Sequence, residues 1–443
     1  FVAEPFMPPE ADLRGSITII FTHPLMRFFG LSADWDMLGV VMEMVYRDAT
    51  EPDKAIRAKA TELTADARSP EETVRRLYHF VQSEIKNLDT ENVAELAAAR
   101  KKRARTSEAQ KPSKTLERRT GTSWDITLLF ASLVRATGLV THLGMSADRE
   151  QLLNANMPKG WIFADRRHVV VDYGDRLGFY NPADRRVPFG LLSRKDEGAM
   201  IYVCRTSGPN WVTAPVASVD QTLVQRTGRF TLDAEGNLEG TVEVQLTGFQ
   251  AMDARDIYAD KTTDEALNDL RTSLTARLPT AEPTELTWSN IHDNTLPFVL
   301  RYKIRVPSYA ETTGTRLLFP VNYFTANTPP RFSAETRNFP IFLGTAEKVS
   351  DDVEVELPEG YQLDNATTPA SIGDIASPVF NTYQIKFSAR RRTIIYRRDH
   401  LLGNNGFLNL KKESYPALRR VFDQVHRADS HQIVLKPAAP SGT

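Results

Sequence analysis

Residues 121–138, Gly121-Thr-Ser-Trp-Asp-Ile-Thr-Leu-Leu-Phe-Ala-Ser-Leu-Val-Arg-Ala-Thr-Gly138, are the stretch that decides the fold. Apolar residues recur in it at helical spacing, and Gly138 is typical of the residue that follows a helix. The stretch therefore predicts a buried helix from Trp124 to Thr137. Ser123 stands at its beginning, where free backbone N–H groups and the helix dipole stabilise a developing anion. That place suits a nucleophile, although Ser123 is also a good N-cap residue.

Two residues further along the chain supply partners for such a nucleophile. His168 opens the alternating segment His168-Val-Val-Val-Asp172, which predicts a strand, and Asn181 ends the next predicted strand. An imidazole fixed on a strand is a suitable general base, and the Asn181 amide could hold its orientation, as the third group of a triad does. The alternatives are a core histidine at position 168 and an ordinary turn residue before Pro182.

The order of these three stretches resembles the transglutaminase-like, papain-type superfamily. The likeness covers residues 70–192 and is carried by residues 121–138, Arg167–Val171, and Tyr180–Pro182 with Val187–Gly190. It is greatest for bacterial multidomain proteins in which such a core is flanked by β-sandwich domains of unknown function. The resemblance implies that Ser123 occupies the position of the superfamily's cysteine nucleophile, with His168 as the base and Asn181 in place of the usual aspartate.

The serine puts thiol catalysis in doubt. A cysteine thiol ionises readily at a helix terminus, whereas a hydroxyl must pass its proton to a well-aligned base during the attack. One hypothesis is a degenerate Ser-His-Asn site in an inactive protein that acts as an envelope-associated binding or assembly module. The alternative is an acyl-transfer enzyme, a transglutaminase or a peptidase or amidase, in which Ser123 attacks a carboxamide and the backbone N–H groups of Ser123 and Trp124 hold the oxyanion.

Several neighbouring residues have open roles. Trp124 could line the acyl channel or pack in the core. Asp184 is the first alternative to Asn181 as orienting acid, ahead of Asp125 and Asp172. Cys204, the single cysteine, is expected to be a small buried residue. A single cysteine also excludes an intrachain disulfide and a cysteine-based zinc site, and we expect neither a metal nor another cofactor.

The order of predicted helices and strands indicates an α+β fold. Residues 1–48 are predicted to hold a linker, the end of a preceding β domain with a strand at 16–22, and a first helix. The transglutaminase-like core follows at 49–212. Two mainly β modules of sandwich type, each with one helix, are expected at 213–345 and 346–443. The chain begins without methionine or a signal sequence, so we expect a mature or truncated product.

Charge and hydropathy narrow the classes of partner. The formal net charge is −1 over 443 residues, and the basic segment at 99–119 contains acidic but no aromatic residues. A solvated loop or helix end is therefore favoured there over a nucleic-acid site. No apolar run is long enough to cross a bilayer. The expected partner is a protein or peptide, and the resemblance implies a periplasmic, cell-surface or secreted location.

Overall fold

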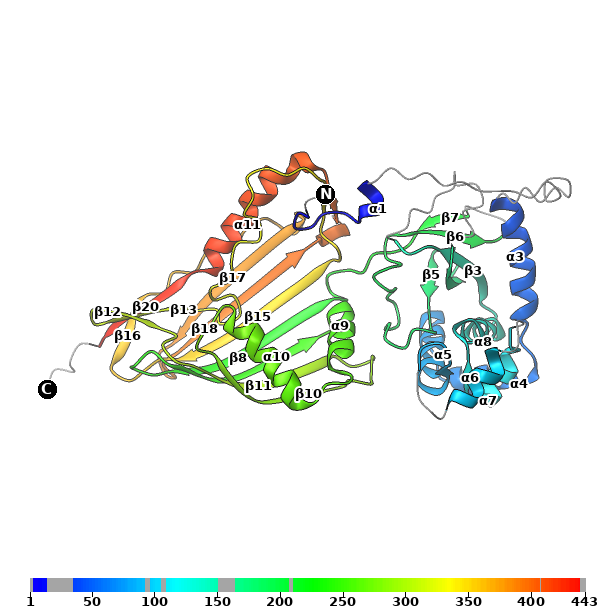
Figure 1. Cartoon of the computed structure of the whole chain (residues 1–443), viewed down its shortest axis with the longest axis horizontal. Helices are drawn as coiled ribbons and strands as arrows, with labels where there is room; N and C mark the ends of the chain where they lie inside the picture. Colours follow the sequence, from blue (N-terminus) through cyan, green and yellow to red (C-terminus); the bar gives the residue numbers. More distant parts are fainter. Residues whose placement is uncertain are drawn as a thin grey trace. The chain divides into compact units, whose positions relative to one another are not determined.

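The computed structural model describes residues 3–13, 35–91, 96–104, 109–149, 164–206, 210–406 and 408–438. The chain divides into two compact units (Figure 1). The core unit comprises Pro9–Val216, and the sheet unit comprises Phe1–Pro8 with Ala217–Thr443. The strand expected at 16–22 lies outside the described residues. The expected α+β class is confirmed.

The core unit begins with helices. They are α1 (Glu10–Leu13), α3 (Trp35–Ala49), α4 (Lys54–Thr64), α5 (Pro70–Glu84), α6 (Ala97–Ala104), α7 (Pro112–Arg118) and α8 (Ser123–Ala136). The start of helix α5 is specified by residues next to it in the sequence. The Ser69 side chain accepts a hydrogen bond from the Glu72 N–H, and Pro70 occupies the first turn. In α8 every residue from Asp125 to Val134 is buried. Helix α8 is thus the central helix of this unit's hydrophobic core.

A five-stranded antiparallel sheet completes the core unit. Its strands are β3 (Val140–Ser146), β4 (Arg166–Asp172), β5 (Leu177–Tyr180), β6 (Met200–Cys204) and β7 (Trp211–Thr213), in the order β5-β4-β3-β6-β7. Val169 and Val171 belong to the cluster that includes α8, whereas Val170 belongs to a second cluster with Ile201 and Val203. Strand β4 is therefore covered on both faces, and alternate residues point to opposite sides. A short parallel pair, β1 (Lys86–Asn87) with β2 (Thr120–Gly121), leads into α8.

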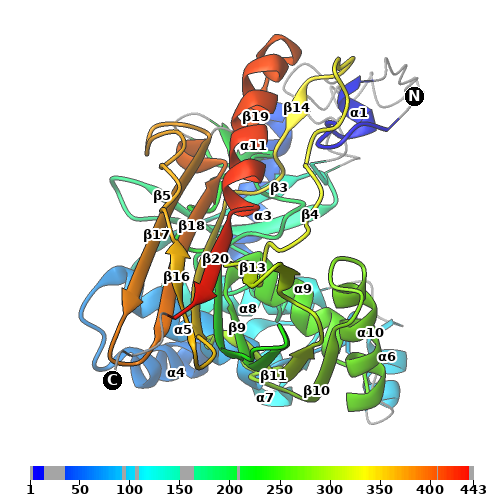
Figure 2. The same cartoon turned by 90° about the vertical axis from the view of Figure 1, so that its left-hand side faces the viewer.

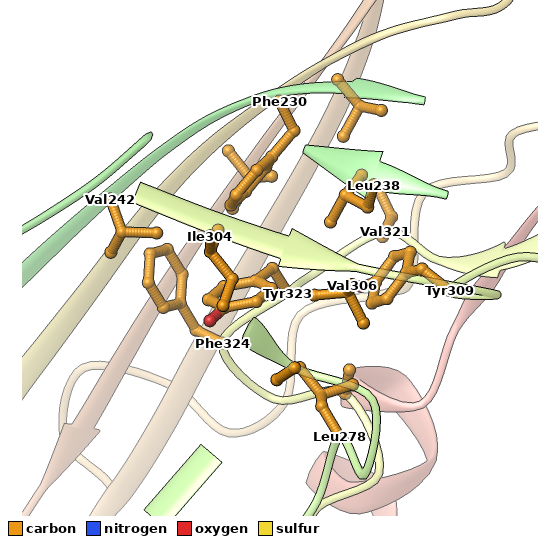
Figure 3. Packing of buried hydrophobic residues seen from close by; sticks show 14 of the residues in the cluster. Phe230, Leu238, Val242, Leu278, Ile304, Val306, Tyr309, Val321, Tyr323 and Phe324 are labelled. Atoms are coloured by element: carbon orange, nitrogen blue, oxygen red, sulfur yellow. The ribbon is translucent and has the colours of Figure 1, made fainter. Parts of the chain in front are cut away.

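The sheet unit is built on one seven-stranded sheet of order β10-β11-β9-β8-β15-β18-β17 (Figure 1). Its strands are β8 (Leu223–Leu232), β9 (Leu238–Leu246), β10 (Glu282–Ser289), β11 (Phe298–Val306), β15 (Glu347–Glu356), β17 (Val379–Ser388) and β18 (Thr393–Leu402). Side chains of β8, β9 and β11 pack with Val321, Tyr323 and Phe324 in a single core (Figure 3).

Smaller elements surround this sheet. They are the four-stranded sheet β12 (Glu311–Thr313), β13 (Arg316–Pro320), β20 (Gln432–Pro437) and β16 (Tyr361–Asn365), the pair β14 (Ile341–Phe342) and β19 (Asn409–Leu410), and helices α9 (Gly248–Tyr258), α10 (Thr263–Thr275) and α11 (Tyr415–Asp429). Helix α11 leads almost directly into β20 (Figure 2). Its buried residues, Tyr415, Leu418, Phe422 and Val425, lie at helical spacing.

The sheet unit does not divide near residue 345, where the sequence predicts a module boundary. Strand β15 pairs in parallel with β8 from Lys348 opposite Leu223 to Glu356 opposite Thr231. The hydrophobic core likewise joins residues from both sides of the expected boundary. Residues on both sides of position 345 therefore contribute to one seven-stranded sheet and one hydrophobic core, where the sequence predicts two modules. Helix α3, expected outside the transglutaminase-like core, packs on β3 and β6 within the core unit.

Candidate active site

The start of helix α8 is fixed by Thr122. The Thr122 hydroxyl accepts from the Asp125 N–H, and the Asp125 carboxylate accepts from the Thr122 N–H, which makes a reciprocal capping box. Ser123 is consequently the first helical residue and does not cap the helix, contrary to the sequence-based alternative. Gly121 is required by packing, because a Cβ there would lie 2.8 Å from Asp125 Cβ.

The hydroxyl of Ser123 is held by Asn87 at the end of β1. Asn87 Nδ2 donates to Ser123 Oγ at 3.1 Å, and Ser123 Oγ donates to Asn87 Oδ1 at 3.4 Å. The same buried amide also donates to the carbonyl oxygen of Ala183 at 2.8 Å. An amide does not take up a proton at neutral pH, so Asn87 positions the Ser123 hydroxyl but is no general base for it.

The backbone N–H of Ser123 is hydrogen bonded to a carboxylate. Asp89 Oδ2 accepts from the Ser123 N–H at 2.8 Å. This N–H is one of the two that the acyl-transfer hypothesis assigns to the oxyanion. The negative charge of Asp89 interacts favourably with the helix dipole and satisfies the Ser123 N–H. It also repels a second anion at this place, whether a thiolate or an oxyanion. The arrangement therefore opposes the charge development that acyl transfer requires at this position.

His168 is not brought to Ser123. It lies on β4, and its side chain is on the same face of the sheet as that of Val170. Both side chains lie beside Gly144 of the neighbouring strand β3, where an added Cβ would meet Val170 Cγ2 and His168 Cβ. Its Nε2 lies 2.8 Å from Ser146 Oγ, and its buried Nδ1 has no hydrogen-bond partner among the residues that the structure describes. The ring is fully buried. The imidazole is thus engaged on the face of the sheet opposite to α8.

Buried charges surround this imidazole. Asp196 lies 3.6 Å from His168 Nε2 and is bonded by Arg166 and by the Ser193 hydroxyl. Burial lowers the pKa of His168 below its usual value; Asp196 acts in the opposite direction, and Arg166 adds to the lowering. Burial raises the pKa of Asp196, but Arg166 and His168 outweigh it, so the pKa is lowered. The pair is a neutral imidazole beside an ionised carboxylate.

The two candidate orienting residues lie in the loop after β5. Asn181 follows Tyr180, which pairs with Val169, and its carbonyl oxygen accepts from the Tyr78 hydroxyl at 3.3 Å. Within the described part of the chain, no hydrogen bond of the Asn181 side-chain amide is found. The Asp184 carboxylate accepts from the backbone and side chain of Arg186. Neither residue is hydrogen bonded to His168.

The remaining candidates have structural partners. Trp124 is half-buried and packs against the core cluster of α8. Both carboxylate oxygens of Asp125 accept hydrogen bonds from Arg103, at 2.8 and 2.9 Å. Arg103 belongs to the basic segment at 99–119, which the sequence analysis assigns to a solvated loop or helix end. Asp172 accepts from the Gly174 N–H. Cys204 is fully buried, and burial raises the pKa of its thiol to about 12.

Sequence reasoning missed four residues outside α8 whose side chains contact Ser123 or His168. They are Asn87, Asp89, Ser146 and Asp196. No motif marks them, because each meets its partner through the sheet or a loop. The only local signal is that Asn87 and Asp89 end the segment directly after α5. Across the described residues no group of three or more His, Cys, Asp or Glu side chains could hold a metal ion.

Residues 57–172, which include Ser123 and His168, match the transglutaminase-like superfamily. This part of the chain is a transglutaminase-like core. Residues 315–435 match a domain of unknown function with a solved structure, DUF3858. The matched range includes residue 345, where the sequence analysis predicts a module boundary. No curated protein matches the chain. Over the described residues, no helix of the chain is long and apolar enough to cross a membrane.

One solved structure resembles this chain over most of the chain's length. It is that of a candidate protease from Parabacteroides distasonis, with 10% sequence identity and a TM-score of 0.47. The similarity covers 90% of this chain and 58% of that protein, so the chain spans little more than half of the other protein's length.

Proposed function

We propose that this transglutaminase-like protein binds a protein or peptide without catalysing acyl transfer, and acts as a binding or assembly module at the cell envelope. The observation that supports it is the separation of the two groups that catalysis must join. The Ser123 hydroxyl is bonded to Asn87, whereas the His168 imidazole is bonded to Ser146. The envelope location rests on the resemblance to bacterial multidomain proteins.

The chemistry of each group supports the same proposal. A serine hydroxyl attacks a carboxamide only if an aligned base removes its proton, and the amide of Asn87 cannot do so. The backbone N–H that would stabilise the oxyanion already binds the carboxylate of Asp89. Acyl transfer by Ser123 would require both the release of Asp89 and a new position for a buried imidazole.

The test is an activity assay on the protein as it stands. Amine incorporation into a glutamine-containing protein and hydrolysis of an unstructured peptide are measured for the native chain and for Ser123→Ala, with an active transglutaminase as positive control. Both forms should remain at the rate of the protein-free reaction. Activity of the native chain that disappears in Ser123→Ala would establish the alternative, an acyl-transfer enzyme with a serine nucleophile.

A further inference from the structure

A pocket lies in the sheet unit between helix α11 and strands β8, β15 and β18, with a volume of about 220 Å³. It belongs entirely to residues 226–429 and is independent of the transglutaminase-like core. Its polar lining consists of three arginines, two histidines, two carboxylates and two threonines: Arg226, Arg331, Arg398, His400, His426, Glu347, Asp429, Thr325 and Thr328. So many charged groups around one pocket suggest a charged ligand.

Two of the three arginines are neutralised by carboxylates, of which Asp351 is buried and Asp429 is half-buried. Arg226 donates to both oxygens of Asp351 at 2.6 and 2.9 Å. Arg398 donates to both oxygens of Asp429 at 2.6 and 2.7 Å. Asp351 and Arg398 are buried, so these fork-shaped pairs form a fixed base for the pocket. Neither guanidinium needs a further anion.

Arg331 differs from the other two. Within the described residues it makes no hydrogen bond or ion pair, and its guanidinium carbon lies over the rings of Phe6 and Phe422, at 5.1 and 5.4 Å from their centres. Aromatic faces hold a guanidinium in place but leave its N–H groups unsatisfied. An exposed arginine held in this way at a pocket can therefore bind a carboxylate or a phosphate group of a ligand.

His400 adds a hydrogen-bond acceptor. Its Nδ1 lies 2.8 Å from Asn381 Oδ1, and Asn381 Nδ2 donates to the Tyr383 hydroxyl at 3.2 Å. Because an amide oxygen only accepts, Nδ1 carries the proton and Nε2 is left as an acceptor. Burial lowers the pKa of His400 well below its usual value, with Arg398 and Arg331 adding to the effect. The ring is therefore neutral and accepts a hydrogen bond from a ligand N–H.

The rest of the lining is apolar and limits the kind of anion. Side chains of Phe324, Pro329, Val349, Phe422 and Val425 form it. A fully hydrated inorganic anion gains nothing from such walls, whereas an apolar substituent does. We propose that the pocket binds a carboxylate with an apolar substituent and an adjacent N–H, the chemistry of an N-acylated amino acid or a peptide C-terminus.

Isothermal titration calorimetry on the full chain tests this proposal with N-acetylleucine, its uncharged amide N-acetylleucinamide, and inorganic phosphate. N-acetylleucine should bind at a single saturable site, and the uncharged amide should not. Arg331→Gln should weaken binding at least tenfold, because a charge-assisted pair is lost. Arg390→Gln, which changes an exposed arginine in the turn between β17 and β18, should leave binding unchanged.

The Glu347→Gln variant should change the affinity for N-acetylleucine in the opposite direction to Arg331→Gln. Glu347 is the remaining carboxylate of the pocket lining, and it accepts from Gln250 Nε2 at 3.4 Å. Removal of its charge should tighten N-acetylleucine binding several-fold, a result that stays decisive if Arg331→Gln fails to fold. The proposal is overturned by an absence of saturable N-acetylleucine binding, by equal affinities of the Arg331→Gln and Arg390→Gln variants, or by binding of phosphate alone.

Discussion

The Asp89 carboxylate accepts a hydrogen bond from the Ser123 backbone N–H at 2.8 Å. Ser123 is the first residue of helix α8, at its positive end, where the resemblance to the superfamily predicts the nucleophile. A helix N-terminus lowers the free energy of an anion in its first turn, and here Asp89 already uses that effect. The helix is thus stabilised by an exposed carboxylate in place of a reacting group.

A cysteine introduced at position 123 should therefore be an ordinary thiol. We expect the pKa of the Ser123→Cys thiol to lie near or above the usual value of about 8.5, and Asp89→Asn to lower it by about half a unit. The rate of iodoacetamide alkylation against pH, followed by mass spectrometry, measures this. Cys204 does not interfere, because it is buried and its pKa is raised to about 12.

The matched control for that experiment is Asp175→Asn, which removes an exposed carboxylate in the turn after β4. It should leave the alkylation profile of Ser123→Cys unchanged. A thiol pKa below about 7 in the Ser123→Cys protein with Asp89 intact would show that the carboxylate does not govern the site.

Thr122 and Ser123 should differ in their contributions to stability. Thr122→Ala removes the N-cap of α8 and is expected to lower the free energy of unfolding by about 1 kcal/mol. Ser123→Ala removes only the bonds to Asn87 and should cost less. Urea unfolding of the two variants compares them directly. A larger loss for Ser123→Ala than for Thr122→Ala would contradict the assignment of the cap.

His168 should make the core unit sensitive to mild acid. Burial lowers its pKa in the folded state, whereas the unfolded chain titrates near 6.5. As the pH falls below that value the unfolded state takes up a proton that the folded state does not. The free energy of unfolding should therefore fall by up to about 1.4 kcal/mol per pH unit from this residue alone. His168→Asn should remove that part of the pH dependence, and Ser146→Ala should keep it.

The readout for this comparison is urea unfolding at pH 7.5 and 5.5 in a Trp288→Phe background. The remaining tryptophans all belong to residues 9–216, so fluorescence then reports on the core unit. Equal losses of stability between the two pH values for the native sequence and for His168→Asn would contradict a neutral, buried imidazole.

Much of the fold could be predicted because its signals are local. Helices α5 and α8 have N-terminal caps within their own sequence, and α5, α8 and α11 all have apolar stripes. The hairpin of β17 and β18 lacks such local signals. Its turn contains no glycine or proline, and Arg392 takes the left-handed conformation with φ 49°.

Long-range relations could not be predicted. The parallel pairing of β8 with β15 joins segments more than a hundred residues apart, and no turn sequence specifies it. The position of His168 illustrates the same limit. Alternation puts residues 168, 170 and 172 on one face, but Val169, Val170 and Val171 are all apolar because both faces of β4 are covered. The sequence therefore does not tell which face meets α8.

The most direct test of the account is the acyl-transfer activity of Ser123→Cys. This variant places a cysteine where the resemblance predicts the superfamily's nucleophile, and it leaves Asp89, His168 and Asn181 unchanged. Amine incorporation and peptide hydrolysis should both remain at the level of Ser123→Ala, because the imidazole is bonded to Ser146 and the helix terminus to Asp89. Amine incorporation or peptide hydrolysis by Ser123→Cys above that level would contradict the account and show an intact site that lacks only its thiol.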